Sequence, residues 1–522
     1  MDTGYKPNLL KKIKMKKYKI FTNICKQLFY KTRTSLFFIM ACVSLMITSC
    51  VDQDDFVNLS PEDRIDAGAF FSNADELVFA VNGIYSSQRS VYGNTLHFYL
   101  IEARSDNAAL NQYEQKERVE TDTFEETPGN LLLVQVWTQN YILINNANTI
   151  IARAPDVPAD NSVEEGLLTR SVGEAKFIRA MAYFTLVNMF GDLPLRIEPT
   201  TDFENADLAR SPSADIYALI VSDLTDAISV LPNSYAGGSF NEVGRATKSA
   251  AQALLGKVQL QNGNKSAASS ALSSVIGQYN LLANYADIHA PGNNNTAESV
   301  YEVNFNPANQ TGLGMNNSFI PASVASSLGI VAGGQAGRLG CFPTQDFMTI
   351  YEVGDLRSPS NFALYDNNGS MEPYISKYID AAAAGSGSDI NLVVLRYADV
   401  LLMKAEADGE NAASYELVNQ VRRRAFGQDP GTADSAIDIS SASPGTFLDK
   451  VMLERRRELA FENHRWSDLK RLSSSETLSI INAQMAAEYT GIPNVSAYQL
   501  IYPIPQGEID VSNGVVTQNP GY

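Results

Sequence analysis

Apolar residues recur every three or four positions along most of this chain, which is the pattern of helices that bury one face. The first such stretch follows Ser72 and Asn73, two residue types that suit a helix N-cap, and its apolar positions include Leu77, Val81 and Ile84. The same periodicity predicts further helices over residues 131–154, 165–190, 213–231, 248–261, 265–276, 396–408, 412–425 and 447–461. We therefore expect a mainly α-helical fold.

Glycine and proline mark the ends of these helices. Gly191 and Pro194 follow the 165–190 helix at the spacing of a glycine cap with a proline just beyond it. The segment 502–522 contains the run Tyr-Pro-Ile-Pro and ends in Asn-Pro-Gly-Tyr. We expect it to lie extended against the body and to contain no helix, because proline interrupts helical hydrogen bonding.

Two pairs of these helices look like copies of one unit, each being two helices joined by a three-residue turn. The turns are Asn262-Gly263-Asn264 and Gly409-Glu410-Asn411. Small residues, among them Ala250, Gly256 and Ala405, would let the paired helices approach closely. This arrangement is typical of tetratricopeptide repeats, although the full repeat consensus is absent. Unrelated helical hairpins in a bundle are the alternative interpretation.

Two stretches lack helical periodicity and are the candidates for a binding surface. The first, residues 92–113, is rich in aromatic and polar side chains, and the second, residues 291–340, has a short β-like run at 299–305 and then many Gly, Ser and Asn residues. The candidate ligand contacts are Tyr92, His97, Tyr99, Arg104, Asp106 and Tyr113 in the first stretch, with Asn317, Phe319 and Phe342 in or just past the second. For each residue, an ordinary place on the surface or in the core is the alternative.

The first 49 residues differ from the rest in charge. They carry ten Lys and Arg but one acidic residue, which leaves 30 basic and 57 acidic residues, a net charge of −27, from Cys50 onward. Residues 36–47 are apolar except for one serine, a run shorter than the roughly 20 residues that span a bilayer. A basic segment followed by a short apolar run is typical of a secretion signal, which could start at Met1 or Met15.

The end of this segment, Ile47-Thr48-Ser49-Cys50, resembles a bacterial lipobox, in which the cysteine thiol receives diacylglycerol. We predict that residues 1–49 are a signal peptide and that acyl chains on Cys50 hold the protein on the outer membrane. Residues 50–60 are acidic and poor in apolar side chains, so we expect a flexible lipidated tether. A plain signal peptide with a chance cysteine is the alternative.

Residues that could carry catalysis or bind a metal are few. His97, His289 and His464 are the only histidines, and none has a second ligand at metal spacing. The chain lacks His-Glu-x-x-His, Cys-x-x-Cys and Gly-x-Ser-x-Gly motifs. Its acidity argues against nucleic acid as a partner, because phosphate contacts need clustered Lys and Arg. Two carboxylates would suffice for a glycosidase, but the acids lie on helix faces and in the tether, so we predict a non-enzyme without cofactor or metal.

Several sequence blocks occur in a fixed order over nearly all of the chain after Cys50. They are Trp137-x3-Tyr141-x3-Asn145-Asn146, Gly173-Glu-Ala-Lys-Phe-Ile-Arg-Ala180 with Phe190-Gly-Asp-Leu-Pro194, Gly244-Arg-Ala-Thr-Lys248, Leu395-Arg-Tyr-Ala-Asp-Val-Leu-Leu402, Val421-Arg-Arg-Arg-Ala425, Glu454-Arg-Arg-Arg-Glu-Leu-Ala-Phe-Glu462, Arg465-Trp466-x-Asp468-Leu469 and Gln518-Asn-Pro-Gly-Tyr522. Together with the lipobox, these blocks resemble the SusD/RagB family of surface nutrient-binding lipoproteins of Bacteroidetes.

The resemblance implies a tetratricopeptide-like helical scaffold with an irregular, loop-rich ligand-binding lobe and few short strands. An N-terminal region, 61–290, and a C-terminal region, 291–522, would pack as one compact body. It also implies a partner, a SusC-like TonB-dependent outer-membrane transporter, over which the lipoprotein would sit as a hinged lid facing the cell exterior. The ligand would be an oligosaccharide passed on unaltered.

The family blocks are mainly scaffold, so we interpret Trp137, Trp466 and the Glu/Arg cluster at 454–465 as packing and internal ion pairs. Starch-binding members use tryptophan as a sugar platform, whereas a platform here would have to be Tyr or Phe, which puts starch in doubt. A peptide ligand is the alternative within the family. A structural lipoprotein of the transporter assembly, with no ligand of its own, is the alternative outside ligand binding.

Overall fold

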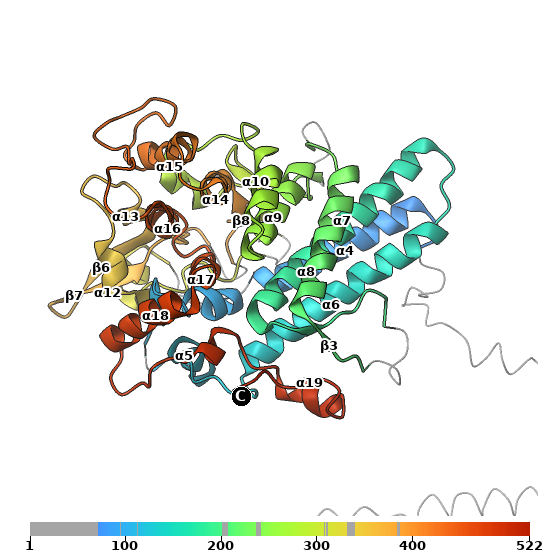
Figure 1. Cartoon of the computed structure of the whole chain (residues 1–522), viewed down its shortest axis with the longest axis horizontal. Helices are drawn as coiled ribbons and strands as arrows, with labels where there is room; N and C mark the ends of the chain where they lie inside the picture. Colours follow the sequence, from blue (N-terminus) through green and yellow to red (C-terminus); the bar gives the residue numbers. More distant parts are fainter. Residues whose placement is uncertain are drawn as a thin grey trace, which may run out of the picture. The chain divides into compact units, whose positions relative to one another are not determined.

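Four long helices of the first part of the chain pack side by side, with apolar faces of the outer three against the central one. The computed structural model describes residues 71–93, 95–111, 113–200, 207–235, 242–306, 308, 312–330, 340–383 and 387–522, and the predicted signal peptide, Cys50 and the tether lie outside them. The four helices are α4 (Ala74–Tyr92), α6 (Leu131–Arg153), α7 (Ser162–Phe190) and α8 (Ser213–Val230) (Figure 1). Residues 71–522 form one compact unit.

The ends of these helices follow the capping residues seen in the sequence. The Asn73 side chain accepts a hydrogen bond from the backbone N–H of Glu76 and caps α4, as predicted. Helix α7 ends at Gly191, whose φ of +75° lies in a region that favours glycine. From Ser171 to Phe190, α7 is buried on most of its sides, so it is the central helix of the group.

The predicted helix pairs are present and stack in order. They are α9 (Lys248–Gln261) with α10 (Lys265–Ser273), and α14 (Tyr397–Asp408) with α15 (Ala412–Ala425), with α8 packing on α9 and α10 on α14 (Figure 1). A Cβ atom on Gly256 would lie 2.4 Å from Cγ of Leu272, so the close approach of α9 and α10 requires the small residue found there. The tetratricopeptide-like, mainly helical prediction is confirmed.

The described strands form short antiparallel pairs, two of which join parts of the chain that are far apart in sequence. The pair β4 (Ser299–Val303) and β8 (Leu392–Arg396) contains the predicted β-like run. The others are β1 (Ala108–Leu110) with β5 (Cys341–Pro343), β2 (Leu193–Pro194) with β3 (Arg210–Ser211), and β6 (Phe362–Asn367) with β7 (Ser370–Ile375).

The structure contains further α-helices, together with a π-helix at Phe98–Glu102 and 3-10 helices at Ala154–Asp156, Tyr285–His289 and Ala497–Leu500. The α-helices are α5 (Lys116–Thr123), α11 (Ala322–Ser327), α12 (Gln345–Thr349), α13 (Ser358–Asn361), α16 (Phe447–Glu458), α17 (Arg465–Lys470), α18 (Ser474–Glu488) and α19 (Gln506–Val511). Helix α19 corrects the expectation that 502–522 contains no helix. Pro505 occupies its N-cap, where the missing N–H costs nothing, and the segment has no further proline until Pro520. Across the described residues, no helix is long and apolar enough to cross a bilayer.

The ionic segment at α16 is buried, and its charges are paired with residues from other elements. Arg396 donates to Glu462 at 2.7 Å, and Arg357 donates to Glu454 and Glu458 at 2.7 and 3.0 Å. All five side chains are almost fully buried. The interpretation of this cluster as internal ion pairs is therefore confirmed, and the pairs fasten β8, α13 and α16 to one another.

Candidate ligand-binding site

The β1–β5 ladder joins the two stretches that the sequence marks as aperiodic. Ala109 pairs with Phe342, and Leu110 pairs with Cys341. Just past β1, the Asn111 N–H donates to the Gly340 carbonyl at 3.0 Å. The structure thus brings the end of the first stretch against the end of the second, and this junction is the candidate ligand-binding face.

Buried polar groups hold this junction in place. The Leu110 N–H donates to the Asp122 carboxylate at 2.7 Å, and the Tyr489 hydroxyl donates to the same carboxylate. Burial raises the pKa of Asp122 to about 7. On the other strand, the Thr344 hydroxyl donates to the Asp106 carbonyl at 2.8 Å. Residues from α5, the end of α18 and the segment after β5 therefore fix the backbone beneath the face.

Tyr113 and Phe342 are the predicted contacts that lie at the surface of this face. The Tyr113 side chain is 87% exposed, and its N–H donates to the Asn111 side chain at 3.0 Å, which fixes the turn that carries it. Phe342 is half-buried in β5, between the buried residues Cys341 and Pro343. An exposed aromatic ring on a fixed turn is a suitable surface for the C–H groups of a sugar.

Tyr99 lies beneath this face. Its ring is covered by the Arg118 guanidinium, whose carbon is 4.3 Å from the ring centroid. Arg118 also donates to the Tyr99 hydroxyl at 3.2 Å and to Glu114 at 3.1 Å. Since Tyr99 is only 2% exposed, its role in the structure is to support the helix that follows Tyr113.

Arg104 and Asp106 are buried in internal pairs. Arg104 donates to Glu126 at 2.9 Å and stacks on the rings of Phe124 and Tyr502, 4.1 and 4.0 Å from their centroids. Asp106 accepts hydrogen bonds from Arg465. Burial alone would raise the pKa of Asp106, but the charges of Arg456 and Arg465 outweigh it and hold the pKa below its usual range.

Asn317 and Phe319 are also internal. The Asn317 side chain donates to the Asp380 carbonyl at 2.8 Å and accepts from the Asp380 N–H at 3.0 Å. The Phe319 ring contacts the Phe98 ring, with centroids 4.3 Å apart and the ring planes tilted by 30°. The structure does not bring these two residues to the face with Tyr113. Ligand contact by them, and by Tyr99, Arg104 and Asp106, stays a prediction.

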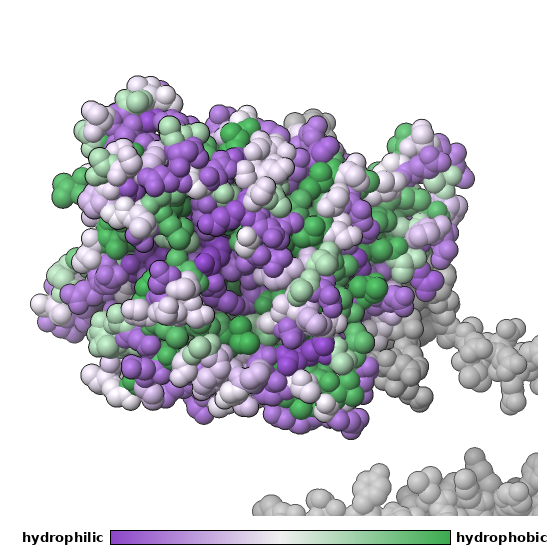
Figure 2. Space-filling model, in the orientation of Figure 1, coloured by the Kyte–Doolittle hydropathy of each residue, from purple (hydrophilic) through white to green (hydrophobic). Residues whose placement is uncertain are grey.

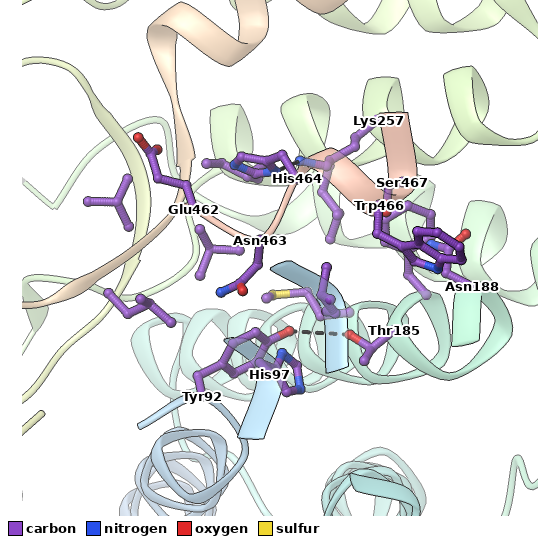
Figure 3. A pocket seen from close by; sticks show the side chains of 18 of the residues that line it. Tyr92, His97, Thr185, Asn188, Lys257, Glu462, Asn463, His464, Trp466 and Ser467 are labelled. Atoms are coloured by element: carbon purple, nitrogen blue, oxygen red, sulfur yellow. Dashed lines mark hydrogen bonds between the residues drawn. The ribbon is translucent and has the colours of Figure 1, made fainter. Parts of the chain in front are cut away.

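Tyr92 and His97 line a cavity of about 100 Å³ between helices α4 and α7 on one side and β8 and α17 on the other (Figure 3). The Tyr92 hydroxyl lies 3.4 Å from the hydroxyl of Thr185, and its ring contacts that of His97. Nε2 of His97 and Oδ1 of Asn463 have no hydrogen-bond partner among the described residues. The cavity has room for several water molecules but is smaller than the roughly 300–1,000 Å³ of typical small-molecule sites.

A lysine and a histidine share one wall of this cavity. The Lys257 ammonium donates to Asp399 at 3.0 Å and to Nδ1 of His464 at 2.7 Å. Burial lowers the pKa of Lys257, and burial lowers the pKa of His464 to about 3. His464 is therefore neutral at neutral pH and accepts the lysine proton in a hydrogen bond, while Asp399 balances the charge.

Sequence reasoning found Tyr92 and His97 but missed the opposite wall of this cavity, because those residues come from separate elements. Lys257 belongs to α9, and His464 and Trp466 to the segment around the start of α17. No local spacing connects these positions, so a search for paired ligands in the sequence could not find them. Across the described residues, no group of three or more His, Cys, Asp or Glu side chains could hold a metal ion.

Surface hydropathy does not single out one region. Figure 2 shows hydrophilic and hydrophobic residues interspersed over one face of the molecule. Exposed apolar residues occur singly on many elements, as they do on most soluble proteins. Strand pairing and exposed aromatic rings, rather than an apolar patch, therefore distinguish the candidate site from the rest of the surface.

Comparison with known proteins gives consistent matches over the whole described body. The SusD family model matches residues 357–522, and a SusD-like model described as starch-binding and associating with the outer membrane matches residues 57–260. A SusD-like protein of Formosa agariphila is 27% identical over 90% of this chain and 95% of its own length. A SusD-like protein of Bacteroides ovatus is 24% identical over 83% of this chain and 81% of its own.

Solved structures match equally widely. One described as a laminarin-binding SusD-like protein has a TM-score of 0.71 at 25% identity and covers 86% of this chain and 100% of that one. A SusD homologue from Bacteroides thetaiotaomicron has a TM-score of 0.73 at 23% identity, covering 89% of this chain and 100% of that one. Because the second structure is only 23% identical in sequence, its similarity shows a shared fold and nothing more.

Proposed function

Because this chain belongs to the SusD/RagB family, we propose that it is an outer-membrane lipoprotein that binds a soluble oligosaccharide at the face carrying Tyr113. The family membership rests on two family models that together match most of the chain. The observation that supports this face is the pairing of β1 with β5, which places the exposed Tyr113 ring and the half-buried Phe342 at one junction.

The chemistry of the face suits a neutral sugar. The Tyr113 ring offers a flat apolar surface for sugar C–H groups. The nearby Glu114 and Arg118 form an ion pair at 3.1 Å and are largely buried, so their charges balance and the face presents no unpaired charge from them. Binding would leave the sugar unchanged, since the family consists of binding proteins.

The name of a solved neighbour suggests a first ligand to test. The neighbour described as laminarin-binding is 25% identical to this chain, and laminarin is a β-1,3-glucan. We therefore place laminarin oligosaccharides first among the glycans, with starch oligosaccharides as the comparison because a starch-binding description accompanies the match to residues 57–260.

Cys50 would anchor the protein, with the acidic residues 50–60 as a tether between the lipid and the folded body. The partner would be a SusC-like TonB-dependent transporter, and the lipoprotein would lie over it as a lid and release the captured glycan into it. An anchored body on a short tether stays near its transporter, which raises the effective concentration for this contact.

Binding assays on a chain that begins at Val51 test the ligand class. This chain keeps the whole compact unit of residues 71–522. Isothermal titration with laminarihexaose, maltohexaose, cellohexaose and mannohexaose should give saturable binding to at least one of them, with the sugar recovered intact. Binding restricted to a peptide library would replace glycan by peptide as the ligand, and cleavage of a bound sugar would contradict the non-enzymatic role.

A further inference from the structure

A second hollow lies on the described body, away from the β1–β5 junction. Its volume is about 360 Å³, within the roughly 300–1,000 Å³ of small-molecule sites. The walls come from three segments: the residues after α8, the residues after α10, and the turn that leads into β4. We name this hollow the β4 groove, after the strand that forms its base.

The rim of the β4 groove carries two tyrosine rings and neutral polar side chains. Tyr279 is half-buried, with its ring centroid 6.3 Å from that of Tyr397, and Tyr235 is held by a hydrogen bond from its hydroxyl to the Ala246 carbonyl at 3.2 Å. The amides and hydroxyl on the rim belong to Asn233, Gln278, Asn295 and Ser299. Aromatic rings beside amides and hydroxyls are the groups that bind neutral sugars.

The floor of the β4 groove is polar, and its two ionisable side chains, Arg245 and Glu302, are held by contacts within the protein. Arg245 is 8% exposed and donates to Glu174 at 2.8 Å, while its Nε atom has no hydrogen-bond partner among the described residues. Glu302 accepts hydrogen bonds from the Asn295 N–H at 2.9 Å and the Asn391 side chain at 2.8 Å. The floor of the groove is therefore formed by polar side chains that hydrogen bonds within the protein hold in place.

The backbone of this floor is fixed by a glycine. Gly244 has a φ of +90°, and a Cβ atom there would lie 1.7 Å from Nδ2 of Asn304. The Asn304 side chain donates to the Val243 carbonyl at 3.0 Å across this position. The Gly244-Arg-Ala-Thr-Lys248 block therefore presents Arg245 to the groove in one conformation.

From these contacts we propose that the β4 groove is a second binding site for a neutral oligosaccharide, separate from the face with Tyr113. The inference rests on the proposed function for the choice of ligand class. An anionic ligand is disfavoured, because Glu174 already neutralises Arg245 and Glu302 adds a carboxyl group to the lining. The site would let one protein hold two sugar segments at once, which increases avidity for a long glycan.

Isothermal titration of the chain that begins at Val51, with the four hexasaccharides named above, tests this inference. We expect two hexasaccharides bound per chain. Tyr279→Ala should reduce the number to one, Tyr113→Ala should also reduce it to one, and the double variant should bind none. Tyr279→Phe keeps the ring and should retain two. Asn233→Trp, a bulky change at the exposed rim, should block the groove without removing any buried group.

Two results would overturn the inference: one site in the native chain that Tyr113→Ala abolishes, or two sites that survive both Tyr279→Ala and Asn233→Trp. Thermal unfolding of each variant shows whether a loss of binding is caused by misfolding. If Tyr279→Ala is misfolded, the binding stoichiometry of Asn233→Trp decides whether the groove is a site. Absence of binding by the native chain to all four sugars would contradict the proposed function and this inference together.

Discussion

Asp106 accepts two hydrogen bonds from the Arg465 guanidinium, at 2.7 and 2.8 Å, and so joins the first aperiodic stretch to the start of α17. Both side chains are at most 7% exposed. The sequence marked Asp106 as a candidate ligand contact, but this pair uses both of its carboxylate oxygens inside the protein. The pair positions the segment that leads into β1, and therefore the face that carries Tyr113.

We predict that Asp106→Asn lowers the free energy of unfolding by about 3–5 kcal/mol, since removal of one partner leaves a buried charge on Arg465 without its counterion. Chemical denaturation of the chain from Val51 measures this loss. The matched control is Asp226→Asn, which breaks the exposed Lys176–Asp226 pair at 2.6 Å and should cost no more than about 1 kcal/mol. Equal losses in the two variants would contradict the structural role of Asp106.

Tyr113→Ala should weaken binding of the preferred hexasaccharide at its face at least thirtyfold, about 2 kcal/mol, so that this site is no longer occupied in the titration. Thermal unfolding should be unchanged, because the ring is exposed. Tyr113→Phe should keep the affinity of that site. Phe79→Ala removes another exposed ring, on α4, and serves as the control. Unchanged affinity at every site of the Tyr113→Ala variant would place the primary site elsewhere.

Protonation of Asp122 should make stability fall as pH rises. Its pKa is raised to about 7 in the folded protein by burial, against about 3.9 in an unfolded chain. The folded state thus holds a proton that the unfolded state releases, so this stabilisation is fully present below about pH 4 and lost as pH rises through 7. Each pKa unit corresponds to about 1.4 kcal/mol.

Asp122→Asn should therefore flatten the change in unfolding free energy between pH 4 and pH 8, measured by denaturant titration. Part of the slope should remain, because burial raises the pKa of Glu102 to about 7 as well. Asp75→Asn, at the exposed start of α4, is the control and should follow the native curve. A native slope retained in Asp122→Asn would show that this carboxyl does not carry the effect.

Gly244→Ala should destabilise the protein by more than about 1–2 kcal/mol, the usual cost of a left-handed conformation for a residue with a Cβ, because the new Cβ also meets the Asn304 amide. Gly277→Ala is the control that separates backbone strain from the steric clash. Gly277 has a φ of +80°, but a Cβ atom there would have no atom within 4 Å, so this variant measures the strain alone. Similar losses for the two variants would mean that Asn304 moves aside without cost.

Cys50→Ser should move the protein from the membrane fraction to the soluble fraction and leave its sugar affinity unchanged. Fractionation of cells that express the full chain, followed by immunoblotting, measures the distribution. The lipid is expected to be the anchor, so its loss removes the apolar chains that insert in the bilayer. Retention of Cys50→Ser in the membrane fraction would show that another segment anchors the protein.

The sequence by itself determined the main scaffold helices, because these depend on local signals. Apolar periodicity predicted α4, α6, α7 and the two stacked pairs, and Asn73 and Gly191 marked two of their ends. Helices α5 and α18 were not predicted, and the short helix α19 was missed because the prolines around it hid a proline-free segment of six helical residues. These features arise within a few residues of one another along the chain.

Only the tertiary structure decided which polar and aromatic residues are exposed. Tyr99, Arg104, Asp106 and Tyr113 lie within one aperiodic stretch, yet the first three are buried by partners such as Arg118, Glu126 and Arg465 that come from later elements. Tyr113 alone of these four remains exposed. The β4 groove also forms only in the tertiary structure. Tyr235, which follows α8, and Tyr279, which follows α10, come from separate segments of the sequence and line one hollow with β4 only in the folded chain. Contacts between residues far apart in sequence leave no spacing pattern, and so the chain order could not reveal them.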